Sequence, residues 1–314
     1  MTAIVGGLAA AVLWATATLC SSRTSRMLGS RVVIAWVMFI GVLVGAPLAL
    51  LTPLPATIEP STYGLLGVAG LCYAGGLWLT YQALTIGKVA IVAPIVATEG
   101  AVAAVIAISL GDTVGLAAGM ALAVIAVGVV LSSMERSTPD VPAGDLDLVA
   151  DALDAPEPAP VAAPGPMSPT PPIAEGDLRR SVILAITAAA VFGIGLVSSG
   201  RAAALLPAVW VALAARIVGV VVISIPIAVT GRLRLTRVAL PLLVVAGAGE
   251  IIGSTASAWG ARESIPIVAV MGSQFAAIAA VAAFVLFGER LGRLQVAGVL
   301  LIVAGVTALA AVQA

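Results

Sequence analysis

The chain has 314 residues, of which 61% are hydrophobic and only 10% charged, and its mean hydropathy is +1.18. A soluble domain of this length needs more polar surface than these residues supply, so the composition excludes a soluble protein and predicts an integral membrane protein. The 15 basic residues balance the 15 acidic ones, so we expect a lipid bilayer as partner and no nucleic acid. The sequence has no histidine to act as a metal ligand.

Five apolar segments of membrane-spanning length occupy the first part of the chain. Hydropathy, together with charged, proline and glycine punctuation, predicts helices near Ala3–Cys20, Val32–Leu51, Tyr63–Leu84, Val89–Leu110 and Thr113–Ser133. About 20 apolar residues cross the hydrocarbon core of a bilayer, and backbone groups in lipid must pair within a helix. Because no Lys or Arg precedes the first segment, we expect a retained helix and not a cleaved signal peptide. Residues 1–133 are therefore predicted to be one five-helix unit.

A second set of five segments follows a polar interruption. Residues 134–180 are rich in Pro, Ala and Asp, a composition that predicts a disordered linker. Beyond it, residues 181–314 form the second predicted unit, with helices near Ser181–Ser199, Ala204–Val229, Val238–Gly260, Ile265–Phe287 and Leu294–Val312.

The two units repeat one another at a spacing of 178 residues. The echoed pairs are Trp14 with Phe192, Gly41 with Gly219, Gly75 with Gly253, Tyr81 with Trp259 and Ala83 with Ala261, and a slip of one residue pairs Gly111, Gly115 and Gly128 with Gly288, Gly292 and Gly305. A unit that crosses the bilayer five times leaves its copy to start on the opposite side. The predicted fold is therefore an all-α membrane protein of ten transmembrane helices in two inverted five-helix repeats, an architecture typical of alternating-access transporters.

Basic residues predict the orientation of the chain in the membrane. Short loops rich in Lys and Arg stay cytoplasmic. Most cations fall in loops that the ten-helix pattern places on the face of the linker: Arg23, Arg26, Arg31, Lys88, Arg136, Arg179, Arg180, Arg232, Arg234, Arg237, Arg290 and Arg293. Only Arg201 and Arg262 fall on the other face. We expect a multi-pass protein of the cell membrane with a cytoplasmic linker and both termini outside.

Three charged residues lie inside predicted spans, where a charge costs about 2.5 to 3.5 kcal/mol on insertion scales. They are Glu99, which follows Pro94 in the fourth segment, Arg216 in the seventh and Glu250 in the eighth. One interpretation is that Glu99 and Arg216 face a central water-filled cavity and bind the charged groups of a substrate. The other is that they form a structural ion pair, and snorkelling is a further alternative for Glu250.

Uncharged residues add weaker candidates for the same site. Trp14, Tyr81 and Gln274 supply aromatic and amide groups suited to an amphipathic small molecule, although aromatic residues also gather at membrane interfaces. Glycines at Gly41 and Gly45, and at Gly111, Gly115 and Gly119, predict close helix packing, either within a protomer or in a homodimer.

Motifs of soluble and membrane enzymes are missing from the sequence. It has no HisGluXXHis, no GlyXSerXGly, no P-loop and no pair of intramembrane aspartates. We therefore expect neither an enzyme nor a cofactor or metal site.

Several short motifs resemble the EamA-type family of the drug/metabolite transporter superfamily. Trp14-Ala15 and Phe192-Gly193 stand where each repeat of that family carries TrpGly. Pro94 with Glu99 is similar to the pattern in the fourth helix of that family. The run LeuPheGlyGluArgLeu, from Leu286 to Leu291, is similar to the sequence that ends each repeat of the family. Departures occur at Asp112, where the family has Glu, and at Phe275, where Glu99 would repeat.

The resemblance implies two five-helix repeats and secondary transport of a small metabolite or drug, and we expect the outward direction. Because burial in an apolar span favours the protonated form of a carboxyl group, a further hypothesis is that protonation of Glu99 couples flux to a proton gradient. The resemblance also implies cytoplasmic termini, in conflict with the charge pattern. The alternative function left open by the sequence is a non-transporting membrane scaffold that recruits a partner through its acidic linker. An ion channel fits less well, because it would need more charged residues in the spans.

Overall fold

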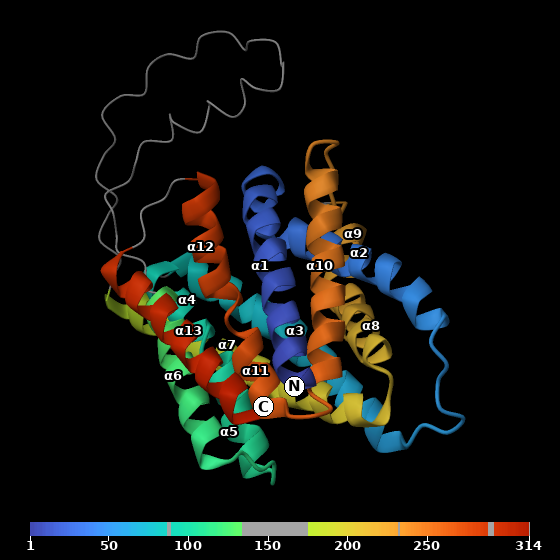
Figure 1. Ribbon diagram of the computed structural model, residues 1–314. Helices are drawn as coiled ribbons and strands as arrows, with labels where there is room; N and C mark the ends of the chain where they lie inside the picture. The colour runs from blue at the N-terminus through green and yellow to red at the C-terminus, as the bar shows by residue number, and fades with distance from the viewer. Residues whose placement is uncertain (87–88, 134–174, 232, 288–291, 314) are drawn as a thin grey trace, which may run out of the picture.

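The computed structural model describes residues 1–86, 89–133, 175–231, 233–287 and 292–313. The first half folds into α1 (Thr2–Leu28), α2 (Ser30–Leu50), α3 (Pro60–Ile86), α4 (Val89–Val96), α5 (Glu99–Ser109) and α6 (Leu116–Ser133) (Figure 1). The second half folds into α7 (Glu175–Leu205), α8 (Ala208–Gly219), the π-helical turn η2 (Val220–Ser224), α9 (Ile225–Val229), α10 (Ala239–Gly260), α11 (Ile265–Gly272), α12 (Phe275–Phe287) and α13 (Arg293–Gln313). All regular secondary structure in these ranges is helical.

Many of these helices are long enough to cross a membrane. Within the described residues, seven are apolar over at least 18 residues, and shorter apolar helices run over Pro94–Ser109, Leu116–Ser132 and Ile265–Ala279. The length and composition of the helices make this chain a multi-pass membrane protein. The prediction of ten spans remains a prediction, since three of the segments are short.

Several predicted boundaries differ from the structure, among them the end of the first helix and the end of the linker. Helix α1 continues to Leu28, past the predicted end at Cys20, because its last two turns carry polar residues that hydropathy does not count as helix. Helix α7 begins at Glu175, so residues 175–180, which were assigned to the linker, are helical. The rest of the predicted linker lies outside the described residues.

The fourth and ninth predicted helices are each interrupted near the middle. Helix α4 ends before Ala97 and Thr98, and α11 ends before Ser273 and Gln274. At the first interruption the Thr98 hydroxyl donates to the carbonyl of Ile95 at 2.6 Å, and at the second the Ser273 hydroxyl donates to that of Val270 at 2.9 Å. Each hydroxyl thus satisfies a carbonyl near the break, which an interruption in an apolar interior requires.

The two interruptions meet at a close crossing of the two halves. A methyl group on Gly100, in the first turn of α5, would lie 2.4 Å from the backbone oxygen of Ala269 and 2.8 Å from the hydroxyl of Ser273, both on the α11 side. Only glycine permits this approach. The crossing fixes the position of Glu99 against the second half.

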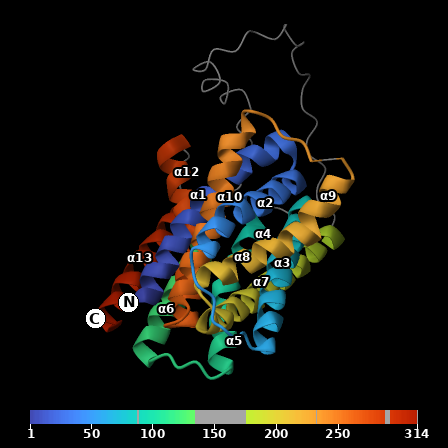
Figure 2. The same cartoon turned by 90° about the vertical axis from the view of Figure 1, so that its right-hand side faces the viewer.

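The main helix contacts join the halves in matching pairs. The most extensive are those of α1 with α10 and of α3 with α7, and exchanging each helix for its counterpart converts one pair into the other. Helix α2 likewise packs on α8 and α6 on α13, each on its own counterpart, and α5 packs on α11. In Figure 1 and Figure 2, α1 and α10 lie side by side, and α1 begins at the same end of the bundle as α13 finishes.

Polar contacts close the end of the bundle where the chain begins. Arg201 of α7 donates to Asp112, between α5 and α6, at 2.6 Å. The amino group of Met1 lies 2.5 Å from Glu263, between α10 and α11. These contacts join the first half to the second. Arg31 and Arg234 lie at the opposite end, beside the start of α2, where the indole nitrogen of Trp36 donates to the carbonyl of Arg234.

Candidate functional site

Arg216 lies in the interior of the bundle. Its side chain, from the last turn of α8, is 1% exposed and passes over Gly41 of α2, where a methyl group would lie 3.2 Å from Arg216 Cδ. Helix α8 reaches this depth because its other buried residues are Ala, Val and Leu, which pack against α2, α3 and α10. An arginine this deep needs partners for its charge and its five N–H groups.

The partners come chiefly from α10. Arg216 Nη2 lies 3.1 Å from Glu250 Oε2 and donates to the carbonyl of Glu250 at 3.2 Å and to the Ser254 hydroxyl at 2.7 Å. The guanidinium carbon stands 4.3 Å from the centre of the Tyr73 ring, a cation–π contact. The Tyr73 hydroxyl donates to the same Glu250 oxygen at 2.6 Å. Arg216 Nε is buried and has no hydrogen-bond partner.

This cluster brings equivalent residues of the two halves into contact. Arg216 Nη1 lies 3.6 Å from the sulfur of Met38, 178 positions earlier in the chain, and Tyr73 bonds to Glu250 at a separation of 177. The first separation is that of the sequence echo, and the second differs from it by one residue. The glycines match too, because Arg216 covers Gly41 while Met38 covers Gly219. Arg216 therefore meets the residue that the sequence echo pairs with it, where α8 of the second half packs on α2 of the first.

Glu99 lies apart from this cluster. It is 9% exposed, and among the described residues no hydrogen bond or ion pair reaches its carboxylate. The predicted alternative of a structural pair between Glu99 and Arg216 is therefore not what the structure contains, since Arg216 pairs with Glu250.

Two other sequence candidates flank the second interruption. Trp14 of α1 meets Phe275 edge to face at a centroid distance of 6.5 Å, and its indole nitrogen is buried with no hydrogen-bond partner. A methyl group on Gly272 would lie 3.1 Å from the Trp14 ring. Gln274 is 3% exposed and its amide nitrogen lies 3.3 Å from the sulfur of Met271. Tyr81 belongs to α3, and its side chain lies outside the described residues.

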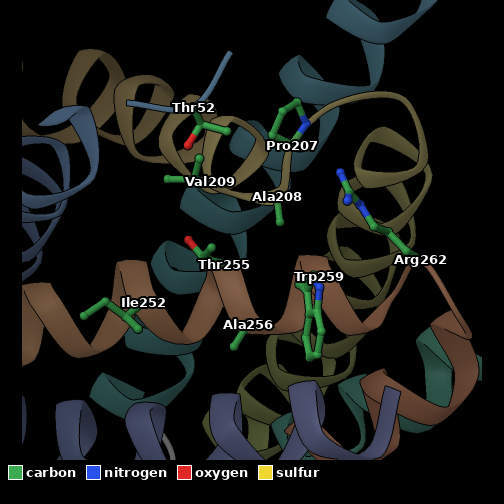
Figure 3. A pocket seen from close by; sticks show the side chains of 9 residues that line it. All are labelled: Thr52, Pro207, Ala208, Val209, Ile252, Thr255, Ala256, Trp259 and Arg262. Carbon is green, nitrogen blue, oxygen red and sulfur yellow. The ribbon is translucent and has the colours of Figure 1, made fainter. Parts of the chain in front are cut away.

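An apolar groove of about 440 Å³ lies between the end of α10 and the start of α8 (Figure 3). Arg262 stands at one end and donates to the carbonyls of Ala203 and Leu206, both at 2.7 Å. A smaller cavity of about 270 Å³ is lined by Ala97, Thr98 and Ser273 at the helix interruptions and by residues of α5 and α6. Neither of these two spaces is lined by Glu99, Arg216 or Glu250.

Three site residues were not found from the sequence: Met38, Tyr73 and Ser254. They are uncharged, and hydropathy gives them no distinction. The repeat spacing carries the signal for Met38, the counterpart of Arg216, whereas Tyr73 lies one residue after the counterpart of Glu250. Ser254 follows Glu250 by one helical turn and so shares its face.

Comparison with known proteins agrees with this architecture. Residues 1–134 match the model of the family described as "EamA-like transporter family". The first half of the chain is EamA-like. The match confirms the resemblance predicted from Trp14, Pro94 and Glu99, and members of this family are transporters and not enzymes.

A solved structure titled "Crystal structure of protein" has a TM-score of 0.73 with this chain at 16% sequence identity, covering 98% of this chain and 95% of the other. At that identity the likeness concerns the fold, and it extends over both halves. No curated protein matches the chain. The helices of membrane-spanning length are those of a multi-pass membrane protein, and its residues 1–134 are similar to a family of transporters.

Proposed function

We propose that the chain is a secondary carrier that exports a small metabolite or drug across the cell membrane by alternating access of two inverted five-helix repeats, with the segment from residue 134 to the start of α7 in the cytoplasm. The observation that carries the proposal is the cluster of Arg216, Glu250 and Tyr73, which joins α8 and α10 of the second half to α3 of the first. Charges are costly at that depth in a membrane protein and mark substrate or ion pathways.

The pairing of the halves supports alternating access. Counterpart helices pack on one another, and both broken helices cross at Gly100, so two related packings of the same halves are open to the chain. The Arg201 to Asp112 pair joins the halves at the end where the chain begins and closes that end in this conformation. The substrate site then includes Glu99, Arg216, Glu250, Trp14 and Gln274, with Tyr81 from α3.

The test of transport uses purified protein in liposomes. Vesicles loaded with a soluble metabolite extract should release at least one compound faster than protein-free vesicles, as measured by mass spectrometry of the medium. A variant with residues 142–170 deleted should keep this release, because a carrier needs only the two helical halves. If no compound leaves faster than from protein-free vesicles, the carrier proposal is wrong, and loss of release on deletion would favour a role for the linker.

Orientation has its own test. With Cys20 and Cys72 replaced by alanine, single cysteines at Arg31 and Thr236 should react in intact cells only with permeant reagents, and one at Glu59 should also react with impermeant ones. The reverse pattern would place the termini in the cytoplasm, as the family resemblance implies.

A further inference from the structure

The two glutamates of the interior differ in how many partners they have. Glu250 receives a hydrogen bond from Tyr73 and an ion pair from Arg216, and its backbone carbonyl also accepts from Arg216. The positive charge of Arg216 is in turn matched by Glu250. This cluster is therefore close to neutral as a whole, and its hydrogen-bonding groups are largely used within it.

Glu99 has no such compensation. It is the first residue of α5 after the interruption, and only 9% of its surface is exposed. No side chain among the described residues forms a hydrogen bond or ion pair with it. The elements packed on α5 are α7, α11 and α6. Helices α6 and α11 contain no titratable residue, and the charged residues of α7 lie near its ends, with Arg201 engaged by Asp112. Glu250 of α10, the other interior carboxylate, is negative as well.

Counting these charges gives one uncompensated negative charge in the described interior. Glu99 and Glu250 are negative, Arg216 is positive, and the other buried polar residues among those described are hydroxyls and the Gln274 amide. An unpaired carboxylate in an apolar interior is unfavourable by several kcal/mol, so the group takes either a proton or a cation.

We propose that the carrier's substrate is an amphipathic monoamine whose ammonium group binds Glu99 in exchange for one proton. This inference rests on the proposed function and specifies its substrate class. When the amine binds, the proton of the Glu99 carboxyl leaves to water and the ammonium takes its place, so the net charge of the site is the same in both states. Protonation of Glu99 releases the amine again.

The surroundings of the site disfavour an anion. A carboxylate ligand could reach Arg216 only by displacing Glu250, which would leave Glu250 and Glu99 both without a cation in the same interior. Trp14 favours a ligand with an aromatic ring. Its own ring lies against Gly272, and Gly100, the residue after Glu99, lies against the neighbouring Ser273. Both residues thus border the same turn of the chain, and an indole face also attracts a cation.

Three indole compounds that differ in side-chain charge provide the test: tryptamine, a cation, indole-3-propionate, an anion, and tryptophol, which is neutral. Calorimetric titration of the full chain in detergent, repeated in buffers of different ionisation enthalpy, gives affinity and proton release together. We expect tryptamine to bind at least about tenfold more tightly than either analogue. Where Glu99 is protonated beforehand, about one proton should be released per tryptamine, with an apparent affinity that falls about tenfold per pH unit in the acid range.

The variants Glu99→Gln and Glu263→Gln separate the site from a surface carboxylate. Glu99→Gln should lower tryptamine affinity at least about tenfold and abolish proton release, whereas Glu263→Gln should behave as the wild type. Absence of tryptamine binding, equal binding of the anion, or unchanged proton release in Glu99→Gln would each overturn the inference. If Glu99→Gln fails to fold, the pH dependence of tryptamine affinity in the wild type still tests the inference.

The vesicle assay keeps the two proposals distinct. Release of other compounds from loaded vesicles without tryptamine binding would support a carrier and reject the amine. Tryptamine binding with proton release, but no flux of any compound, would support the cation site and reject transport.

Discussion

Glu99 and Glu250 are both glutamates in the interior of an apolar bundle, and they differ in what surrounds them. Glu250 has Arg216, Tyr73 and Ser254 in one connected cluster, whereas Glu99 has no bonded partner among the described residues. The difference shows that burial of a charge does not by itself define its role. A partnered carboxylate can hold two halves together, and an unpartnered one is available to a ligand or a proton.

The largest expected effect comes from removing the partner of Glu250. Arg216→Met places the residue of the counterpart position, Met38, in both halves and leaves Glu250 without a cation. We expect the free energy of unfolding to fall by about 3 to 5 kcal/mol, because a buried charge loses its compensation. Denaturant unfolding in detergent micelles measures this loss. The double variant Arg216→Met, Glu250→Leu should recover most of it, and a single variant as stable as the wild type would mean that the pair contributes nothing to the fold.

A smaller effect should separate the two glutamates directly. Glu250→Gln weakens the bonds from Arg216 and Tyr73, so we expect a loss of about 1 to 3 kcal/mol in unfolding free energy. Glu99→Gln removes a charge that has no bonded partner, and stability at pH 8 should stay unchanged or rise. Thermal unfolding of both variants under one set of conditions makes the comparison. Equal destabilisation would show that Glu99 has a structural partner of comparable strength.

The crossing that positions Glu99 can be tested at its neighbour. Gly100→Ala would bring a methyl group to 2.4 Å from the backbone oxygen of Ala269, which cannot rotate away. We expect a loss of about 1 to 3 kcal/mol from overpacking, and a change in tryptamine binding as Glu99 shifts. The matched control is Gly119→Ala in α6, where no atom lies within 4 Å, and its stability should stay level or increase. If both variants unfold alike, the two broken helices do not cross this closely.

Much of this arrangement follows from the sequence, and the rest depends on packing. Hydropathy located the helices, and Glu99, Arg216 and Glu250 were recognised as interior charges because each stands in an apolar run. The partner of Arg216 was not predictable, since it depends on which face of α10 meets α8. The interruption at Ser273 and Gln274 was also missed, because no proline marks it, whereas Pro94 pointed to the vicinity of the first.

Glu263 separates the effect of partners from that of burial, because it has many partners but 39% side-chain exposure. Hydrogen bonds from the Met1 amino group, the Thr2 hydroxyl and the Ala3 N–H lower the pKa of Glu263 from its ordinary 4.5 to about 2. A carboxylate with a lowered pKa stabilises the fold fully above about pH 4.5, and this contribution is lost as pH falls toward 2. Solvent screening at an exposed site keeps it under about 1 kcal/mol. Melting temperatures of the wild type and Glu263→Gln should therefore differ slightly at pH 7 and converge toward pH 3. A constant difference in melting temperature across that range would show that these contacts do not depend on the charge of Glu263. The exposure of this carboxylate would then matter more for its stabilising effect than the number of its hydrogen-bond partners.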